Sequence, residues 1–184
     1  MIKKHYYSWN DIESMCTELV TSMYTSNYMP DYIVGITRGG NVPATIISNM
    51  LNVPCEALKV SLRDNTKLES NSYMAEDAFG YNNGTKVSGS RWDPGLRKKI
   101  LIVDDINDTG ATFNWIIQDW QKSCFPEEAG PWKTVWGNNV KFAVLTENLS
   151  SHFHLTSFFA HEVNKADEDI WLVYPWEDVG LYGR

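Results

Sequence analysis

The sequence predicts an α/β fold with a doubly wound, mainly parallel sheet and flanking helices. Two short runs, 32–36 and 100–103, are apolar without polar alternation, which is typical of strands covered on both faces. A turn and a helical pattern follow each run, and strands that alternate with helices indicate a parallel sheet. At 184 residues the chain can form one domain with a sizeable core.

The N-terminal part predicts a helix, a strand, a second helix and a second strand. Apolar residues recur at helical spacing over 10–25, and Asn10 with Glu13 is expected to form the capping box. The strand over 32–36 leads through a turn into the second helix, and residues 55–62 form the next strand. Two parallel strands joined by a helix make a right-handed βαβ unit.

The rest of the chain predicts a long loop followed by the other half of the sheet. Residues 63–99 are polar and rich in Asn, Gly and Ser, so we expect a mobile loop there. A helix is expected after the run 100–103, and further strands over 140–146, 157–163 and 170–174. We therefore expect one domain over 1–184, with a small hood formed by the C-terminal segment 147–184.

The most informative segment is 100–112, Ile-Leu-Ile-Val-Asp-Asp-Ile-Asn-Asp-Thr-Gly-Ala-Thr. Asp104 and Asp105 follow the apolar strand, where they can accept hydrogen bonds from a vicinal diol and approach a divalent cation. The next residues offer backbone N–H groups, hydroxyls and small side chains at a helix N-terminus, where an anion is favoured; they are Asp108, Thr109, Gly110, Ala111 and Thr112. This layout of charge suits a ribose 5-phosphate.

Two other interpretations of this segment are open. It can be an ordinary strand-to-helix turn, in which Asp108 or Thr109 caps the helix. It can also hold a phosphoacceptor Asp-Asp pair like that of a receiver domain, although such a pair lies near the chain start and lacks the Thr-Gly-x-Thr ending.

The segment resembles the signature of the type I phosphoribosyltransferases, which is a hydrophobic strand, two acidic residues, a spacer and Thr-Gly-x-Thr. The resemblance implies transfer of ribose 5-phosphate from phosphoribosyl pyrophosphate to a nucleobase, with help from Mg²⁺. Residues 108–112 would hold the 5-phosphate. Asp104 and Asp105 would bind the ribose hydroxyls and, directly or through water, the metal. Asp108 would act as general acid or base at N7 of the base.

A second glycine-rich turn closes the strand over 32–36. Arg38, Gly39 and Gly40 stand there, and ligands of open α/β sheets bind at such strand ends. Glycines allow close backbone approach, and arginine can bind phosphate oxygens with two donors. In the family the equivalent turn binds pyrophosphate and often carries a non-proline cis peptide. Alone, the turn could equally be a glycine-rich helix entry with a surface arginine.

The C-terminal stretch 169–177 resembles a segment of the xanthine-guanine and hypoxanthine phosphoribosyltransferases, in which an aromatic ring stacks on the purine. Trp171 is the matching residue, and an ordinary core tryptophan is the alternative. One departure concerns the base. Those enzymes carry a lysine for the 6-oxo group after the strand that matches 140–146, whereas Glu147 and Asn148 stand here. A 6-oxopurine, and with it purine salvage, is the expected assignment, while the base itself stays open.

The composition of the chain limits the kinds of binding partner and the cellular compartment that we expect. A net charge of −7 argues against bulk electrostatic binding of nucleic acid. Three widely spaced cysteines favour neither a disulfide framework nor a zinc site. No apolar stretch approaches a membrane span, so we expect a soluble, cytoplasmic protein. His152, His154 and His161 receive no metal, and a homodimer is expected from the family resemblance.

Two other activities fit the same motifs. A non-catalytic relative could sense phosphoribosyl pyrophosphate or a nucleotide and regulate a partner, an interpretation that Asn107 and the missing lysine keep open. A hydrolase of the same sugar donor would release pyrophosphate without any base.

Overall fold

The computed structural model describes residues 1–60, 62, 72–81, 93–123 and 129–177. Its central layer is a five-stranded parallel sheet in the order β3-β2-β4-β5-β6. The strands are β2 (Tyr32–Ile36), β3 (Cys55–Leu58), β4 (Ile100–Asn107), β5 (Val140–Asn148) and β6 (Thr156–Val163). The chain runs outward from β2 to β3, then returns to β4 on the other side of β2. The strand order therefore reverses between β2 and β4, where open α/β sheets bind their ligands.

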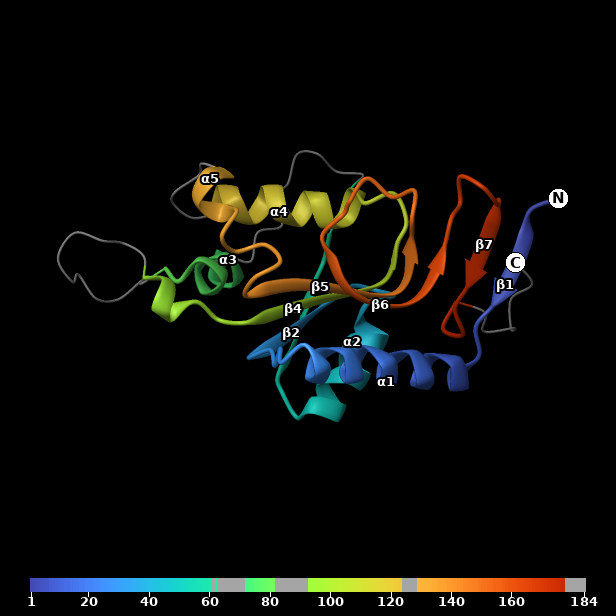
Figure 1. The fold of residues 1–184 in the computed structure, drawn as a ribbon, viewed down its shortest axis with the longest axis horizontal. Helices are drawn as coiled ribbons and strands as arrows, with labels where there is room; N and C mark the ends of the chain where they lie inside the picture. Colours follow the sequence, from blue (N-terminus) through green and yellow to red (C-terminus); the bar gives the residue numbers. More distant parts are fainter. Residues whose placement is uncertain (61, 63–71, 82–92, 124–128, 178–184) are drawn as a thin grey trace.

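Helices cover both faces of this sheet, which confirms the predicted doubly wound fold (Figure 1). One face carries α1 (Trp9–Thr25) and α2 (Asn41–Leu51). The other carries α3 (Ser72–Phe79), α4 (Ala111–Ser123) and α5 (Ala129–Trp132), and a short 3₁₀ helix, η1 (Pro94–Leu96), precedes β4. In the described part of the chain, no helix has the length and apolar character needed to cross a membrane.

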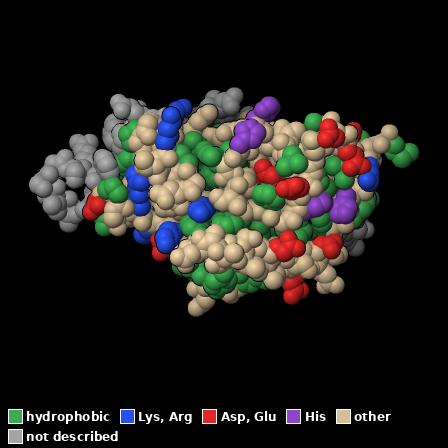
Figure 2. All heavy atoms as spheres, in the orientation of Figure 1, with side chains coloured by type: hydrophobic (Ala, Val, Ile, Leu, Met, Phe, Trp, Pro, Cys, Tyr) green, Lys and Arg blue, Asp and Glu red, His purple; other side chains and the backbone are tan. Residues whose placement is uncertain are grey.

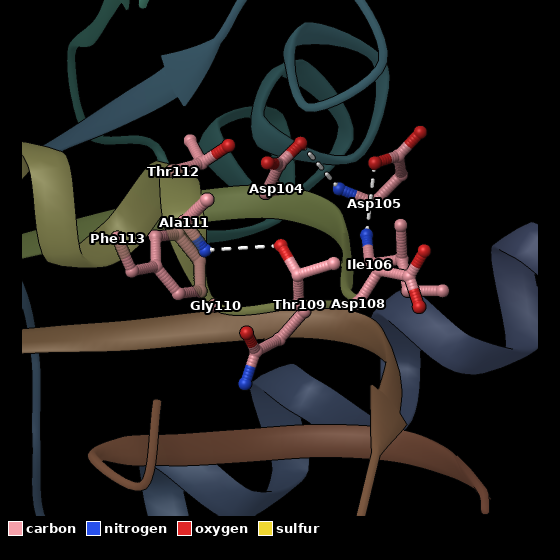
Figure 3. A pocket seen from close by; sticks show the side chains of 10 residues that line it. Asp104, Asp105, Ile106, Asp108, Thr109, Gly110, Ala111, Thr112 and Phe113 are labelled. Atoms are coloured by element: carbon pink, nitrogen blue, oxygen red, sulfur yellow. Dashed lines mark hydrogen bonds between the residues drawn. The ribbon is translucent and has the colours of Figure 1, made fainter. Parts of the chain in front are cut away.

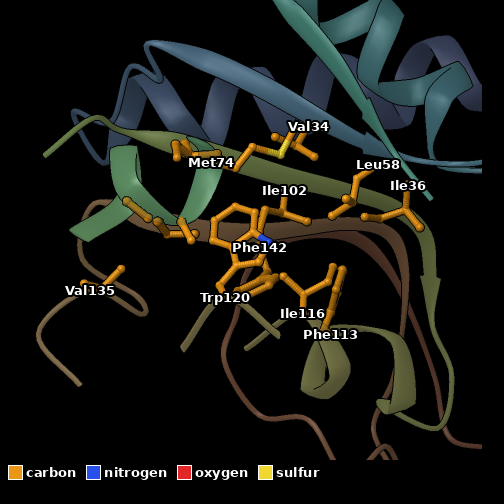
Figure 4. Close-up of a cluster of buried hydrophobic side chains, with 14 of the residues drawn as sticks. Val34, Ile36, Leu58, Met74, Ile102, Phe113, Ile116, Trp120, Val135 and Phe142 are labelled. Atoms are coloured by element: carbon orange, nitrogen blue, oxygen red, sulfur yellow. The ribbon is translucent and has the colours of Figure 1, made fainter. Parts of the chain in front are cut away.

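The position of β4 inside the sheet, covered on both faces, explains why its sequence shows no polar alternation. Ile100 and Ile102 face the cluster that includes Trp120 and Phe142 on the α3 and α4 side (Figure 4). Leu101 and Val103 face the opposite cluster, which contains the buried residues of α1 and α2. Since these four β4 side chains are fully buried, apolar residues are required on both faces of the strand.

The α1 helix lies where its periodicity predicts, but its N-terminal cap is two residues earlier than expected. Ser8 is extended and its hydroxyl accepts the Asp11 N–H at 3.1 Å, while Asp11 accepts the Ser8 N–H at 2.7 Å. The predicted Asn10–Glu13 capping box is wrong, because the helix already includes Trp9 and Asn10. The observed Ser-x-x-Asp box satisfies the free backbone N–H groups at the helix N-terminus in the same way as the predicted box.

The stretch 63–99, predicted as a mobile loop, contains a buried helix. Met74, Ala75, Ala78 and Phe79 of α3 are inaccessible to solvent and join the core cluster on the α4 side. Arg97 fixes the end of this segment, because its Nε–H donates to the Phe79 carbonyl at 3.0 Å. Residues 63–71 and 82–92 of the predicted loop lie outside the described residues.

The C-terminal segment divides between two sheets. The β6 strand completes the central sheet, whereas β7 (Ile170–Val173) pairs in parallel with β1 (Lys3–Tyr6) as a separate two-stranded sheet beyond β6 (Figure 1). The sequence did not predict β1, since its four side chains are all exposed and show no apolar pattern. The segment 147–184, expected to form a hood, thus includes the end of β5 and all of β6, which belong to the main sheet, and 178–184 lie outside the described residues.

Charged side chains are unevenly spread over the face drawn in Figure 2. Acidic side chains predominate over the half that carries β6, β7 and β1, while most visible Lys and Arg side chains lie over the half with α3 and η1.

Candidate active site

A pocket of about 230 Å³ lies at the carboxyl end of β4 and is lined by ten consecutive residues, 104–113 (Figure 3). The β2 and β4 strands are neighbours in the sheet, so the ends of both strands meet at this point. The pocket therefore occupies the place where the strand order reverses. It contains every residue that the sequence assigned to the ribose and the 5-phosphate.

Asp104 and Asp105 are held by the strand itself. The β4 strand continues to Asn107, and Asp104 pairs with Val144 of β5. Asp104 Oδ1 accepts the Asp105 N–H at 2.9 Å, and Asp105 Oδ1 accepts the Ile106 N–H at 2.8 Å (Figure 3). Sheet pairing and these local hydrogen bonds fix both carboxylates at the pocket.

Ionisation of both carboxyl groups of this pair is unfavourable. Burial raises the pKa of Asp104 well above its ordinary value, and repulsion from Asp105 raises it further. Burial also raises the pKa of Asp105. Two neighbouring carboxylates that are desolvated together are a suitable site for a divalent cation, which binds hard oxygen ligands.

The glycine turn after β2 lies directly against the acidic pair. A Cβ atom placed on Gly39 would stand 2.2 Å from Asp105 Oδ2, and one on Gly40 would stand 2.5 Å from the Val103 carbonyl oxygen. The peptide bond between Thr37 and Arg38 is cis, as the family resemblance implied. The structure thus brings together two strand ends that are distant in the sequence, with Gly39 against Asp105, 66 positions apart, and Gly40 against Val103, 63 positions apart.

The loop after β4 presents free amide groups. Within the described residues, the backbone N–H groups of Asp108, Thr109 and Gly110 have no hydrogen-bond partner in the protein. The Ala111 N–H reaches only the Thr109 hydroxyl, at 3.2 Å (Figure 3). Because α4 begins at Ala111, these donors point from the positive end of a 13-residue helix. The arrangement can hold a phosphate group.

A buried polar network forms the floor beneath this loop. Asn107 Nδ2 donates to Glu147 Oε1 at 2.9 Å and to the Phe153 carbonyl at 3.1 Å, while the Ser151 hydroxyl donates to Asn107 Oδ1 at 2.8 Å. Burial raises the pKa of Glu147. Gly110, at φ +89°, packs so closely that an added Cβ would stand 2.6 Å from the Phe153 nitrogen. The network fixes the loop from below.

Asn107 and Glu147 have structural partners that the sequence did not predict. Both were considered as clues to regulation or to the base, but both are buried and hydrogen-bonded to each other. The sequence did contain a signal for this contact. A polar residue at the end of a buried strand indicates a buried amide, and a buried amide needs a hydrogen-bond partner.

Asn148, which stands at the end of β5 where the xanthine-guanine and hypoxanthine phosphoribosyltransferases carry a lysine, is held by hydrogen bonds within the protein. Its Nδ2 donates to the Asp108 carbonyl at 2.8 Å, and its Oδ1 accepts the Lys165 N–H at 3.0 Å and the Ser150 hydroxyl at 2.9 Å. The amide is therefore engaged with protein groups rather than free to read a base. It joins the pocket loop to Lys165, whose Nζ lies 3.1 Å from Asp108 Oδ1. Sequence reasoning missed Lys165, because only folding brings it to the pocket.

The C-terminal aromatic residues reach the site through Tyr174. Its hydroxyl donates to the Asp105 carbonyl at 3.1 Å and bonds Thr146 Oγ1 at 2.9 Å, and its ring stacks on Trp176. Burial raises the pKa of Tyr174, so this hydroxyl keeps its proton. Trp171 is 58% exposed on β7 and is not among the residues that line the pocket. Its role as base platform stays a prediction.

The histidines form no metal cluster in the part of the chain that the structure describes. No group of three or more His, Cys, Asp or Glu side chains is arranged there to hold an ion by itself. His161 instead contacts the Tyr7 hydroxyl through Nδ1. A cation at Asp104 and Asp105 would need further ligands from substrate and water.

The close approach at Gly39 makes a testable prediction. Gly39→Ala should weaken the binding of pyrophosphate, measured by calorimetry with Mg²⁺, by about tenfold or more, because the new methyl group must displace the turn or the Asp105 carboxylate. Gly130→Ala is the matched control, since a Cβ there meets nothing within 4 Å. Unchanged affinity in Gly39→Ala would contradict this account of the turn.

A second prediction concerns the charge of the acidic pair. The raised pKa of Asp104 means that the folded protein holds a proton which the unfolded chain releases, so folded stability falls as pH rises above about 4. In metal-free buffer at pH 7, Asp104→Asn should raise Tm by about 2–4 °C. This increase in Tm should vanish at about pH 3, where Asp104 is protonated in both the folded and the unfolded chain.

Asp169→Asn is the control for this measurement, because that side chain is exposed and the substitution removes the same charge. A lower Tm for Asp104→Asn at pH 7 would show that Asp104 is stabilised in its charged form.

Known proteins share this fold and sequence. The chain matches the model of the phosphoribosyl transferase domain over residues 3–156. It is 28% identical to the hypoxanthine-guanine phosphoribosyltransferase of Schizosaccharomyces pombe, over 94% of this chain and 88% of the relative. It is 23% identical to xanthine phosphoribosyltransferase 1 of Saccharomyces cerevisiae, over 95% and 90%.

A solved structure agrees in fold. The crystal structure of a purine phosphoribosyltransferase from Pyrococcus horikoshii superposes with a TM-score of 0.62 at 21% identity, covering 100% of this chain and 99% of that one. The resemblance drawn from residues 100–112 is confirmed by these matches. The family model spans most of the chain, including both strand-end turns, and the chain belongs to the phosphoribosyl transferase domain family.

Proposed function

We propose that this protein transfers the 5-phosphoribosyl group of phosphoribosyl pyrophosphate to a 6-oxopurine and releases pyrophosphate. The observation that carries the proposal is the pocket at the end of β4, which combines two carboxylates with unpartnered amide groups at a helix N-terminus. The relatives named above act, by their names, on xanthine or on hypoxanthine and guanine, which supports a 6-oxopurine as the acceptor.

The two ends of the sugar donor match two parts of the site. The free N–H groups of residues 108–110 and the start of α4 would bind the 5-phosphate, with the Thr109 and Thr112 hydroxyls beside them. Arg38 and the Gly39–Gly40 turn would bind pyrophosphate, because the turn already lies against the acidic pair. Asp104 and Asp105 then lie between the two anions, where the ribose hydroxyls would be.

Mg²⁺ is part of the proposal. Asp104 and Asp105 would hold it together with ribose and phosphate oxygens and water, consistent with the few protein ligands that Mg²⁺ takes at phosphate sites. When bound, it supplies positive charge that neutralises the pyrophosphate leaving group. The raised pKa values of the two buried carboxyls fit this use, because a bound cation offsets the cost of burying their negative charge.

Asp108 is the proposed general acid or base. As the bond between the anomeric carbon and the pyrophosphate oxygen breaks, a base nitrogen forms the new bond to that carbon. The proton lost from the imidazole ring of the purine passes to the Asp108 carboxylate, which lines the pocket and is 45% exposed. Binding both anionic ends of the donor fixes the sugar while positive charge develops on it.

We also expect the exposed ring of Trp171 to stack on the purine base, and we expect the protein to be cytoplasmic.

We further expect a homodimer. Trp171 and Trp9 each expose more than half of their surface near the β1–β7 sheet, and exposed aromatic residues of this kind are enriched at protein–protein interfaces.

A panel of bases tests the function. We expect pyrophosphate release from phosphoribosyl pyrophosphate with Mg²⁺ and hypoxanthine, guanine or xanthine, and little release with pyrimidines. Chromatography should show the matching nucleoside monophosphate. Release of pyrophosphate that does not depend on a base would identify a hydrolase instead. No release with any base would overturn the proposed transferase activity.

A double variant separates catalysis from sensing. Asp104→Asn with Asp105→Asn should lower kcat by about 100-fold or more while the protein still binds ribose 5-phosphate, because the amide groups of 108–110 remain. Circular dichroism checks the fold. A wild-type protein that binds phosphoribosyl pyrophosphate without turnover, and a double variant that binds it equally well, would favour a regulator of the same fold.

A further inference from the structure

We propose that His161 is a positioning residue for Asp105, to which it is joined by a chain of four hydrogen bonds. The inference rests on the proposed function, in which Asp105 binds the sugar and a cation. The chain begins on β6, where His161 Nδ1 contacts the Tyr7 hydroxyl, and it ends on β4 at the Asp105 carbonyl oxygen. It therefore connects the acidic pair to the segments that follow β1 and β7.

The contacts of this chain are continuous. The Tyr7 hydroxyl, which contacts His161, lies 3.0 Å from Thr146 Oγ1. Thr146 Oγ1 lies 2.9 Å from the Tyr174 hydroxyl, and that hydroxyl lies 3.1 Å from the Asp105 carbonyl oxygen. Thr146 and His161 are paired across β5 and β6, so the register of the sheet places these two side chains side by side.

The hydroxyl groups of the chain are buried. Thr146 is inaccessible to solvent, and Tyr174 is 2% exposed. The Tyr7 ring stacks on the Tyr174 ring with centroids 5.1 Å apart, and it meets the His161 ring edge-on at 5.7 Å. A buried hydroxyl group needs a hydrogen-bond partner within the protein, so each of the four contacts requires a hydrogen atom.

A count of hydrogen atoms fixes the direction of the chain. The Asp105 carbonyl can only accept, so it takes the single hydroxyl hydrogen of Tyr174. Thr146 must then donate to Tyr174, and Tyr7 must donate to Thr146, because each hydroxyl group has one hydrogen. The fourth contact remains, so His161 must carry a hydrogen on Nδ1. If Nδ1 were an acceptor, three hydroxyl hydrogens would serve four contacts, and one buried contact would have none.

The end of the chain acts on the peptide group between Asp105 and Ile106. The carbonyl of this peptide accepts from Tyr174, and its N–H donates to Asp105 Oδ1 at 2.8 Å. The chain therefore holds the same peptide group that fixes the Asp105 carboxylate at the pocket. Because hydrogen bonds in a row polarise one another, a donor at the His161 end strengthens the bond at the Asp105 end.

The tautomer of His161 tests the direction of the chain without an assay of activity. Burial lowers the pKa of His161, so its imidazole is neutral at pH 8. In ¹⁵N NMR spectra at that pH we expect a hydrogen on Nδ1 and none on Nε2. The signals are assigned by their loss in His161→Asn. A hydrogen on Nε2 with a bare Nδ1 would overturn the proposal.

Kinetics test the effect on Asp105. His161→Leu should lower kcat/KM for phosphoribosyl pyrophosphate by about three- to tenfold, as expected for one lost hydrogen bond, with KM for hypoxanthine changed less than about twofold. His161→Asn should recover most of this loss, because its amide N–H can donate from a position close to that of Nδ1. Phe159→Leu is the matched control, since this exposed side chain lies on the same strand and outside the chain of hydrogen bonds.

A double variant shows whether His161 acts through the chain. Tyr174→Phe removes the donor to Asp105 and should lower kcat/KM for phosphoribosyl pyrophosphate at least as much as His161→Leu. The two substitutions together should lower it no further than Tyr174→Phe alone, because both break the same chain. Thermal unfolding checks that each variant is folded. Losses that multiply in the double variant would show that His161 acts separately from Tyr174.

The remaining outcomes separate this inference from the function on which it rests. A wild-type protein that turns over no base overturns the proposed transferase activity, and the variants are then compared by their Kd for phosphoribosyl pyrophosphate with Mg²⁺. A loss in Tyr174→Phe with no change in His161→Leu overturns the role of His161 alone. A lower Tm in His161→Leu without any change in kcat/KM or Kd would show that the residue only stabilises the fold.

Discussion

The site depends on two adjacent carboxylates held at the desolvated end of a central strand. Burial and mutual repulsion raise the pKa of Asp104, and burial raises that of Asp105, so it is unfavourable for both carboxyl groups to be ionised in the folded protein. Sheet pairing on both sides of β4 holds the pair in place despite this cost. Such a site is stabilised by positive charge and hydrogen-bond donors, which a sugar hydroxyl and a divalent cation provide.

The surrounding protein supports the acidic pair and the loop 108–110 without filling the pocket. Gly39 lets the β2 turn approach Asp105 to a distance that no side chain permits, and Gly110 does the same between the loop 108–110 and Phe153. Asn107 and Tyr174 hold the same region from behind. Because these contacts use the inner sides of the loops, the amide groups of 108–110 remain free for an anion.

The two ends of the pocket carry different chemistry. Asp104 and Asp105 lie near the β2 turn and suit the sugar and a cation, whereas Asp108 is paired with Lys165 and suits a polar base edge. Asn148 connects the pocket loop to the turn after β6. A cationic side chain therefore reaches the pocket loop from an element other than the end of β5.

The doubly wound sheet and the pocket loop after β4 could be predicted from short stretches of sequence. The apolar runs, the helical periodicity and the contiguous motif 100–112 are local, and local patterns can be recognised without the fold. The folded chain was needed to show that residues 72–79 form a buried helix, that β1 pairs with β7, and that Lys165 lies beside Asp108. These features depend on contacts between distant segments. A lysine 57 positions from its aspartate gives no signal until the sheet brings β4, β5 and β6 side by side.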